Sequence, residues 1–335
     1  MTDDLGDPQH QTAAQRAQVW SRYWALGARH SCAGSFGDTY GGAIGLWWQQ
    51  VFSDLRSDER VLDVATGSGA LLQLGLRDCL SAAVNWDGID VGQVAPEWLQ
   101  SLPEDQRHRV RIHPGIDAAT LPFAAGSFDL VTSQYGIEYS DMRQSMAEVR
   151  RVLRQRGRLR CVLHHASSRS VVLARAELDH IRWLLEPEGL LRVVERLCAP
   201  FAQSTTAAGR EALGRDTGAN RLRQSFNALQ DQRVQMAATS ACPDVLHEAS
   251  TAINRVLGLA VEQGAPVAEQ AARDFMEVLR DAAFRLSDLI GHALEPADFP
   301  SLRDLLRGLG FAVQTAELID GKVLLGWSLQ ADLAP

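Results

Sequence analysis

Lysine is almost absent from this chain. Lys322 is the only lysine among its 335 residues, and arginine supplies nearly all of the basic side chains. A phosphate-binding loop of the Walker type ends in Gly-Lys followed by Ser or Thr, whereas Lys322 is followed by a valine. The sequence therefore contains no such loop, which argues against a P-loop nucleotide hydrolase.

Cysteine is also scarce and scattered. The chain has five cysteines, at positions 32, 79, 161, 198 and 242, and no two of them form a Cys-x-x-Cys pair. An odd number of widely spaced cysteines argues against a disulfide framework and against a zinc site. It fits a reducing compartment, and we expect no bound metal.

Long hydrophobic runs are missing as well. Although 46% of the residues are hydrophobic, no run reaches the roughly 18 apolar residues that a membrane-spanning helix needs. The chain starts with Met1-Thr2-Asp3-Asp4, which is acidic and unlike a secretory signal. We therefore expect a soluble, cytoplasmic protein without a membrane partner.

The sequence also has no excess of positive charge. Its 33 Lys and Arg residues and 41 Asp and Glu residues give a net charge of −8. A nucleic-acid partner is disfavoured because neutralising a phosphate backbone needs a basic surface. The one basic stretch, from Arg150 to Arg160, is expected to form a solvated face.

The most informative segment is residues 61–71, which read Val-Leu-Asp-Val-Ala-Thr-Gly-Ser-Gly-Ala-Leu. The apolar run, the glycine-rich break and the apolar pattern that follows predict a buried parallel strand, a tight turn and the start of a helix. Gly67 and Gly69 permit positive φ and leave the backbone bare, and helix N–H groups attract anionic ligands. The segment therefore predicts a site for a nucleotide-like cofactor.

The identity of that cofactor depends on the spacing of the glycines. A dinucleotide-binding fingerprint needs a third glycine three residues after the second, and Leu72 stands there instead. The run from Val61 to Gly69 resembles motif I of the class I S-adenosylmethionine-dependent methyltransferases, written hydrophobic-hydrophobic-Asp-hydrophobic-small-x-Gly-x-Gly.

The next hundred residues extend this resemblance. A second short strand ends at Asp90, 27 positions after Asp63, which is about one strand–helix–strand step. A carboxylate there can accept both ribose hydroxyls of an adenosine. Residues 115–123 resemble the family segment in which an Asp receives the adenine amino group and a Leu-Pro-Phe step covers the ring. Residues 127–135 resemble the family's fourth strand.

The resemblance implies a set of cofactor contacts. The turn at residues 67–69 would hold the methionine portion, Asp90 the ribose, and Asp117 with Ala118 the adenine, while Asp63 would orient the loop or reach the methionine ammonium through water. Ser133 and Gln134 would line the methionine side. The complete predicted set for S-adenosyl-L-methionine is Asp63, Ala65, Gly67, Ser68, Gly69, Asp90, Asp117, Ala118, Ser133 and Gln134.

The resemblance also implies the fold class. We expect an α/β protein with a seven-stranded, mostly parallel, doubly wound sheet and an antiparallel C-terminal hairpin. Its predicted parts are an N-terminal helical cap (1–58), a Rossmann-like core (59–165), a helical insertion (166–298) and a C-terminal helix with a hairpin around Asp320-Gly321 (299–335). In the core we expect a helix over 146–153, a turn at Gly157 and a strand over 159–163.

The insertion carries apolar residues at three- and four-residue spacing. This spacing predicts helices over 171–185, 190–197, 207–236, 245–259 and 267–289, with breaks at prolines that include Pro200. An insertion after the fifth strand would lie above the carboxyl ends of the sheet, where ligands bind. It is interpreted as a substrate lid or a homodimer contact, and the alternative is a structural extension.

Candidate substrate and catalytic residues follow from the strand ends and from the aromatic N-terminal segment. Tyr23 and Tyr40 combine a ring with a hydroxyl, and the other predicted substrate contacts are Tyr135, Tyr139 and His164. His165 and Glu138 are the candidate general bases. Neighbouring strand residues face opposite sides, so at most one of the two histidines should face the cleft.

Together these features predict a methyltransferase that transfers a methyl group from S-adenosylmethionine to an oxygen or nitrogen of a small, partly apolar metabolite. Two alternatives stay open. One is an NAD-dependent oxidoreductase, which Leu72 disfavours, and the other is a non-catalytic binding or scaffold protein that has kept the cofactor fold. The acids at positions 63, 90 and 117 argue against the second.

Overall fold

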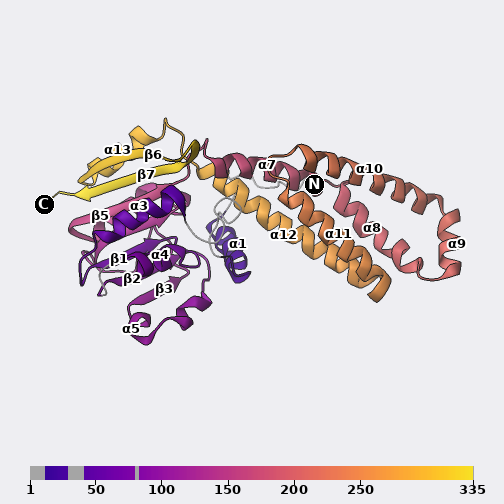
Figure 1. Ribbon diagram of the computed structural model, residues 1–335, viewed down its shortest axis with the longest axis horizontal. Coiled ribbons are helices and arrows are strands. Elements are labelled where there is room, and N and C mark those ends of the chain that lie inside the picture. Colours follow the sequence, from indigo (N-terminus) through magenta and orange to yellow (C-terminus); the bar gives the residue numbers. More distant parts are fainter. Residues whose placement is uncertain (1–11, 29–40, 80–82, 335) are drawn as a thin grey trace. The chain divides into compact units, whose positions relative to one another are not determined.

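The computed structural model describes residues 12–28, 41–79 and 83–334 (Figure 1). The chain forms two compact units. The helical unit is Leu173–Ser287, and the sheet unit consists of the described residues before 173 together with residues 288–334. The helical unit thus lies within the predicted insertion of 166–298.

The sheet unit is built around one mixed sheet. Its strands are β1 (Arg60–Val64), β2 (Asn85–Asp90), β3 (Val110–Pro114), β4 (Phe128–Gln134), β5 (Leu153–Leu163), β6 (Phe311–Asp320) and β7 (Val323–Leu333). They are arranged in the order β3-β2-β1-β4-β5-β7-β6. Neighbouring strands from β3 to β5 pair in parallel, and β7 runs antiparallel to both β5 and β6. The predicted seven-stranded, mostly parallel sheet with an antiparallel C-terminal hairpin is therefore confirmed.

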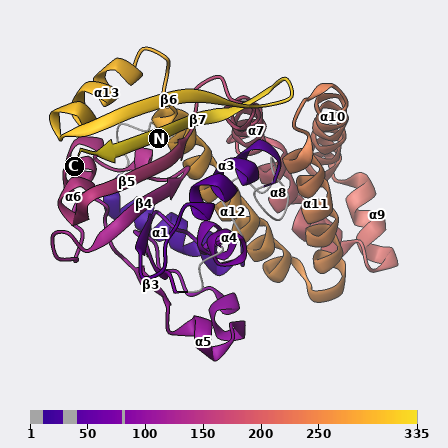
Figure 2. The ribbon, with the colours of Figure 1, turned by 60° about the vertical axis from the view of Figure 1, so that its left-hand side comes forward.

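Helices cover both faces of this sheet (Figure 2). The helices of the unit are α1 (Ala13–Ala25), α3 (Gly42–Ser53), α4 (Ala70–Asp78), α5 (Glu104–Arg107), α6 (Met142–Val152) and α13 (Phe299–Gly308), with 3-10 turns η2 (Glu97–Ser101) and η3 (Ile137–Tyr139). Alternate residues of β1 face opposite cores. Leu62 and Val64 pack in the core that contains α6 and α13, and Val61 packs in the core that contains α3 and α4.

The strand order reverses between β1 and β4, which are both central. Strands β2 and β3 lie on one side of β1, and the strands from β4 onward lie on its other side. In sheets of this type a crevice opens at the carboxyl ends of the strands beside this reversal. The fold therefore places the ends of β1, β2 and β4 around one potential site.

The region before β5 differs from the expectation. The predicted helix over 146–153 is α6, which ends at Val152, and β5 begins at Leu153 without a turn at Gly157. Leu153 is buried and pairs with Phe128, and the register then shifts before Leu130. Arg156 adopts a positive φ of 62° in this irregular stretch. Burial of Leu153 and a strand irregularity thus replace the predicted turn.

The basic stretch at the start of β5 is paired with acids. Arg154 binds Asp129 at 2.7 Å, and Arg158 binds Glu59 at 2.9 Å. Arg160 binds Asp332 at 2.7 Å. These carboxylates offset three of the arginine charges of the stretch.

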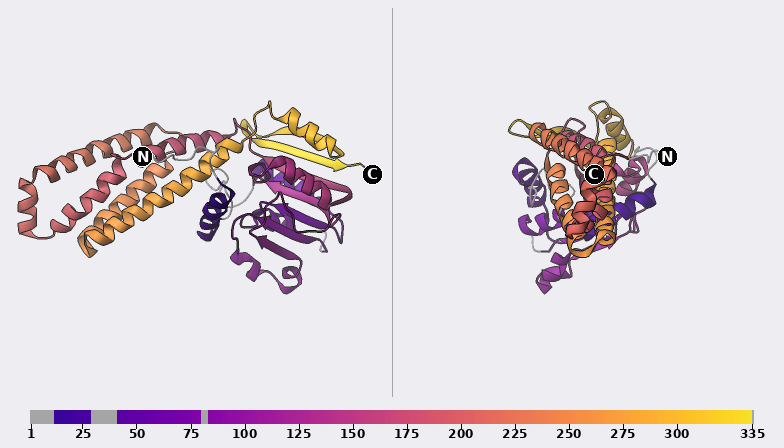
Figure 3. Two further views of the ribbon diagram at one scale, coloured as in Figure 1. Left: turned by 180° about the vertical axis from the view of Figure 1, so that it is seen from behind. Right: turned by 90° about the vertical axis from the view of Figure 1, so that its right-hand side faces the viewer.

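The helical unit is formed by helices, drawn in colours from rose to orange in Figure 3. They are α7 (Arg169–Leu184), α8 (Leu190–Gln203), α9 (Ala207–Arg215), α10 (Thr217–Thr239), α11 (Asp244–Gln263) and α12 (Ala265–His292). Helix α8 packs against both α10 and α11. Among the described residues, no helix has the length and apolar character needed to cross a bilayer.

Two details of the insertion were predicted incorrectly. The helix expected over 207–236 is divided at Asp216, because the Asp216 carboxylate accepts the N–H groups of Gly218 and Ala219 and so begins α10. The break expected at Pro200 does not occur, since Pro200 lies inside α8 near its end. Pro200 lacks the N–H that would bond the Arg196 carbonyl, and α8 ends at Gln203, three residues later.

We predict that Phe52→Ala destabilises the sheet unit by about 3–5 kcal/mol, because it leaves a large cavity in a closed core. Phe52 is fully buried, stacks on Trp48 at a centroid distance of 5.5 Å, and meets Trp86 edge-on at 5.4 Å. Chemical denaturation followed by far-ultraviolet circular dichroism would measure the loss. Leu46→Ala on the same helix is the control, because Leu46 is 67% exposed and should change stability by no more than about 0.5 kcal/mol. Equal effects of the two variants would contradict the packing described here.

Candidate functional site

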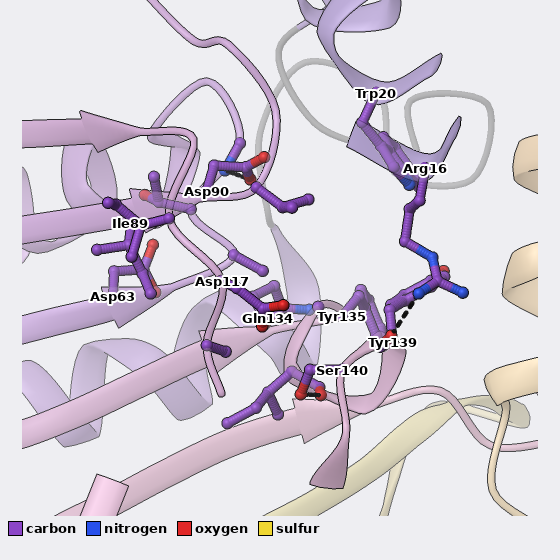
Figure 4. A pocket seen from close by; sticks show the side chains of 18 of the residues that line it. Arg16, Trp20, Asp63, Ile89, Asp90, Asp117, Gln134, Tyr135, Tyr139 and Ser140 are labelled. Atoms are coloured by element: carbon purple, nitrogen blue, oxygen red, sulfur yellow. Dashed lines mark hydrogen bonds between the residues drawn. The ribbon is translucent and has the colours of Figure 1, made fainter. Parts of the chain in front are cut away.

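A cavity of about 290 Å³ lies at the carboxyl ends of β1, β2 and β4 (Figure 4). Side chains from these three strands, from the loops that follow them and from α1 form its wall. The lining residues are Ala13, Arg16, Trp20, Trp24, Asp63, Ala65, Thr66, Gly67, Ala70, Leu71, Ile89, Asp90, Val91, Ile116, Asp117, Ala118, Gln134, Tyr135, Gly136, Ile137, Tyr139, Ser140 and Asp141. All of them belong to the sheet unit, and most of the wall is apolar or aromatic.

The two glycines of the turn after β1 have different surroundings. Gly67 adopts a φ of 53° and lines the cavity, and a Cβ atom at this position would lie 2.6 Å from the Trp24 ring. Gly69 begins α4 with a φ of 79°, and a Cβ atom there would lie 2.7 Å from the Trp98 ring. Gly67 is therefore required on the cavity side, whereas Gly69 makes room for Trp98.

Ser68 also faces Trp98 rather than the cavity. The Trp98 indole Nε1 donates a hydrogen bond to the Ser68 carbonyl at 2.7 Å, and neither Ser68 nor Gly69 is among the lining residues. Of the predicted turn contacts, the structure therefore brings Ala65 and Gly67 to the cavity and leaves Ser68 and Gly69 behind it.

Asp90, the last residue of β2, links this strand to the turn after β1. Its Oδ2 accepts the Gly67 N–H at 2.8 Å, and its Oδ1 accepts the Gly92 N–H at 2.8 Å. Burial raises the pKa of Asp90 to about 6, although these two hydrogen bonds favour the charged form. Each carboxylate oxygen has a second lone pair, so Asp90 keeps the capacity to accept from a ligand hydroxyl.

Asp63 lies deeper, at the end of β1. Its Oδ1 accepts the Thr132 hydroxyl at 2.9 Å. Burial raises the pKa of Asp63 to about 7, and the negative charge of Asp90 acts in the same direction, while the Thr132 hydrogen bond opposes them. Asp63 is therefore easily protonated near neutral pH and is the most strongly perturbed acid of the cavity wall.

Gln134 and Ser133 lie next to each other at the end of β4, but only Gln134 lines the cavity. The Gln134 Oε1 accepts a hydrogen bond from the Trp48 indole, which fixes the orientation of the amide. The Gln134 Nε2 is buried and has no hydrogen-bond partner among the described residues. Ser133 is fully buried, donates to the Val64 carbonyl at 2.9 Å and accepts the Ile137 N–H at 3.0 Å. Gln134 thus presents an unused donor at the cavity, and Ser133 does not line it.

Asp117 and Ala118 lie beside each other in the cavity wall after β3. The Asp117 side chain is exposed, and its Oδ1 accepts the Ala119 N–H at 2.9 Å. This short-range hydrogen bond fixes the carboxylate and leaves its other oxygen for a ligand. Both residues occupy the position at which the sequence predicted the adenine contact.

The aromatic wall from α1 was only partly anticipated. Trp20 and Trp24 stack at a centroid distance of 5.7 Å, and both line the cavity together with Arg16. Tyr23 does not line it; its ring meets Trp20 and Trp24 edge-on at 5.7 and 5.0 Å. The second predicted N-terminal contact, Tyr40, lies outside the described residues.

The predicted general base Glu138 and the predicted substrate contact His164 do not line the cavity. His164 is fully buried, and the Glu138 Oε1 is 2.8 Å from its Nδ1 and accepts its backbone N–H at 2.9 Å. Neither of these two residues lines the cavity, although Tyr135 and Tyr139, whose rings contact His164 at 4.3 and 5.9 Å, both do. Glu138 therefore orients His164 instead of facing a substrate.

His165 requires a correction. Its ring stacks on Trp327 at a centroid distance of 4.5 Å, and its Nδ1 accepts the Ser167 N–H at 2.9 Å. As expected for neighbouring residues at a strand end, the two histidines have different surroundings, but His164 is the one beside the cavity wall. His165 packs against β7, so the geometry does not support a catalytic role for it.

Comparison with known proteins agrees with this geometry. The protein-family model described as a methyltransferase domain matches residues 61–157. The uncharacterized methyltransferase YcgJ of Bacillus subtilis (strain 168) is 30% identical over 140 residues, which cover 40% of this chain and 51% of the relative. A demethylmenaquinone methyltransferase of Thermotoga maritima is 35% identical over 102 residues, which cover 30% of this chain and 42% of the relative. Residues 61–157 therefore match a methyltransferase domain, and the strand order is consistent with a Rossmann-like methyltransferase fold.

The matches cover only part of this chain and part of each relative. The crystal structure of the Bacillus subtilis YcgJ protein aligns with a TM-score of 0.30 and 28% identity, covering 42% of this chain and 58% of that chain. The chain spans about half the length of the curated relatives it matches. The methyltransferase domain supplies Asp63, Gly67, Asp90, Asp117 and Gln134, whereas the α1 wall precedes the matched segment.

We predict that Asp63→Asn stabilises the protein in a pH-dependent way. Between the unfolded pKa of about 4 and the folded pKa of about 7, the folded state holds a proton that the unfolded state has lost. The free energy of unfolding therefore falls as the pH rises through this window and is level above it. Since asparagine carries no charge, the variant should exceed the wild type by about 2–4 kcal/mol at about pH 8 and by much less near pH 4.

Denaturant unfolding of both proteins across this pH range would measure the difference. Asp304→Asn is the control because the Asp304 side chain is 75% exposed, and it should show no comparable pH-dependent gain. A wild-type protein as stable as the variant at the alkaline end would contradict the burial argument for Asp63.

Proposed function

We propose that this chain transfers a methyl group from S-adenosylmethionine to an oxygen or nitrogen atom of a small, partly apolar molecule. The observation that carries the proposal is the convergence of four residues from separate segments on one cavity. They are Gly67 after β1, Asp90 at the end of β2, Asp117 after β3 and Gln134 at the end of β4.

The residues present fit the cofactor that the family uses. The buried Gln134 Nε2 lacks an acceptor among the described residues, and an unsatisfied buried donor is costly unless a ligand supplies one. The cofactor's carboxylate is such an acceptor. Asp90 would accept ribose hydroxyls, and the second oxygen of Asp117 would accept the adenine amino group, next to the backbone of Ala118.

Orientation is the main task left to this chain. The bound cofactor supplies a methyl group that is already activated by the positive sulfur. Trp20, Trp24 and Tyr139 enclose the cavity with aromatic rings, which exclude water and favour a cation nearby. Holding an acceptor in line with the methyl group converts an encounter into an intramolecular step, and this can supply several kcal/mol of the barrier.

The cavity wall also limits the acceptor. Its described lining contains no histidine, and the Asp141 carboxylate in it accepts the Gln144 backbone N–H and side-chain amide. The carboxylates of Asp63 and Asp90 in the same lining, with pKa values raised to about 7 and about 6, are at most weak bases. We therefore propose an acceptor whose oxygen or nitrogen is nucleophilic without a strong base. The aromatic wall supports a partly apolar molecule, and the pairing of the β5 arginines supports an acceptor other than nucleic acid. A homodimer stays a prediction.

We predict that S-adenosylhomocysteine, the demethylated product, binds the wild-type protein in isothermal titration calorimetry. Asp117→Ala should weaken this binding about tenfold, the loss expected for one hydrogen bond of ~1.4 kcal/mol. Gln134→Leu, which removes the unused donor and is of similar size, should do the same. Asp304→Ala, on α13 and outside the cavity lining, is the matched control and should leave affinity unchanged.

The same titration separates the alternatives. Heat with NADH and none with S-adenosylhomocysteine would overturn the proposal in favour of an oxidoreductase. Binding of S-adenosylhomocysteine without transfer of tritiated methyl to any component of a cell extract would instead indicate a non-catalytic protein with the same fold.

A further inference from the structure

Helix α1 is held over the cavity by polar contacts as well as by its tryptophans, of which Trp20 meets the Tyr139 ring edge-on at 6.1 Å. It contributes Ala13, Arg16, Trp20 and Trp24 to the wall, yet Val19 is its only residue that is classed as buried. A helix that buries so little apolar surface gains little from the hydrophobic effect. Its placement must therefore depend on specific contacts to the rest of the sheet unit.

The strongest of these contacts is a two-pronged ion pair. Arg16 Nε donates to Asp288 Oδ2 at 2.8 Å, and Arg16 Nη2 donates to Asp288 Oδ1 at 2.8 Å. The same guanidinium donates from Nη1 to the Tyr139 carbonyl at 3.1 Å, a contact drawn in Figure 4. Arg16 thus connects α1 with the end of α12 and with η3 at the rim of the cavity.

Asp288 is enclosed and charged. Its side chain is fully buried, whereas 18% of the Arg16 side chain is exposed. His292 places its Nδ1 3.1 Å from Asp288 Oδ1. Burial acts to raise the pKa of Asp288, but the hydrogen bonds from His292 and Arg16 outweigh it and lower the pKa below its usual value. The carboxylate is therefore ready to hold Arg16 at neutral pH.

A second, weaker contact lies further along α1. The Ser21 hydroxyl accepts the Gln93 N–H at 2.8 Å, and a Cβ atom at Gly92 would lie 3.3 Å from the Ser21 nitrogen. Three residues after Ser21, the Trp24 ring packs on the bare backbone of Gly67. The polar contacts thus set how α1 meets the turn after β1.

We propose that Asp288 is a positioning residue of the cofactor site, which acts through Arg16 to hold α1 and its two tryptophans over Gly67 and Asp90. Asp288 does not line the cavity, and it lies far along the chain from the methyltransferase domain at 61–157. The inference rests on the proposed function in one respect, which is that the ligand beneath α1 is S-adenosylmethionine.

The first test uses hydrogen–deuterium exchange of the ligand-free protein and needs no cofactor. In Asp288→Asn and in Arg16→Gln, the amides of residues 13–25 should exchange about tenfold faster than in the wild type, while those of β1 and β4 keep their rates. In Arg16→Lys, the exchange rates of residues 13–25 should lie between those of the wild type and of Arg16→Gln, since lysine keeps the charge but cannot form the two-pronged contact. Asp304→Asn, which removes the exposed partner of Arg307, is the control and should change neither region.

The second test measures S-adenosylhomocysteine affinity by calorimetry. Each single variant should weaken binding about tenfold, and the double variant should be no weaker than either single one, because both remove the same contact. If the affinity loss of the double variant equals the product of the two single losses, the coupling of Arg16 to Asp288 is refuted. If Asp288→Asn fails to fold, Arg16→Gln and Arg16→Lys still test the proposal through both measurements.

The two proposals can fail separately. Unchanged exchange of residues 13–25 in Arg16→Gln would refute the positioning role even if the wild type binds S-adenosylhomocysteine. Absence of binding to the wild type, together with faster exchange of α1 in the variants, would refute the cofactor assignment and leave the anchoring of α1 standing.

Discussion

The hydrogen bond from the Gly67 N–H to the Asp90 carboxylate ties the turn after β1 to the end of β2, and the arrangement of the cavity depends on it. The two strands pair in parallel with Asp63 opposite Gly88, so their carboxyl ends meet at one edge of the sheet. The positive φ of Gly67 turns its N–H toward Asp90, and the missing side chain of this glycine leaves room for the Trp24 ring. A residue with a Cβ atom would disturb both the turn and the ring of Trp24 above it.

Burial around this link has a consequence for charge. Asp63 and Asp90 are both nearly inaccessible, and desolvation raises the pKa of each, to about 7 and about 6. Such acids are destabilising when ionised, and a pair of them at the end of a sheet is typical of a functional site rather than of a structural core. The unpartnered donor of Gln134 in the same wall points in the same direction.

Much of the sheet and several residues of the cavity wall could be predicted from the sequence because the signals are local. The run from Val61 to Gly69 combines a buried strand with a turn that only glycine makes easily, and Asp90 follows at the spacing of one strand–helix–strand step. Pairing with distant residues was not predictable. Leu153 joins β5 because it packs opposite Phe128, and Gly69 serves Trp98 rather than a ligand. The direction of His165 depends on Trp327, which lies 162 positions later in the chain.

The position of α1 also depends on a distant residue that the sequence does not reveal. Its tryptophans are visible in the sequence, but the residue that fixes them is a buried aspartate 272 positions away. No local pattern marks Asp288 as the partner of Arg16, since a single acid in a long amphipathic helix usually faces solvent. Only the fold, which brings α1, η3 and the end of α12 together, shows that this acid pairs with Arg16.

A crystal structure of the protein with S-adenosylhomocysteine tests the central assignment most directly. The account predicts the adenine at Asp117 and Ala118, the ribose hydroxyls on Asp90, and the ligand carboxylate within hydrogen-bonding distance of the Gln134 Nε2. A ligand bound elsewhere, or one that leaves the Gln134 amide without an acceptor, would contradict it.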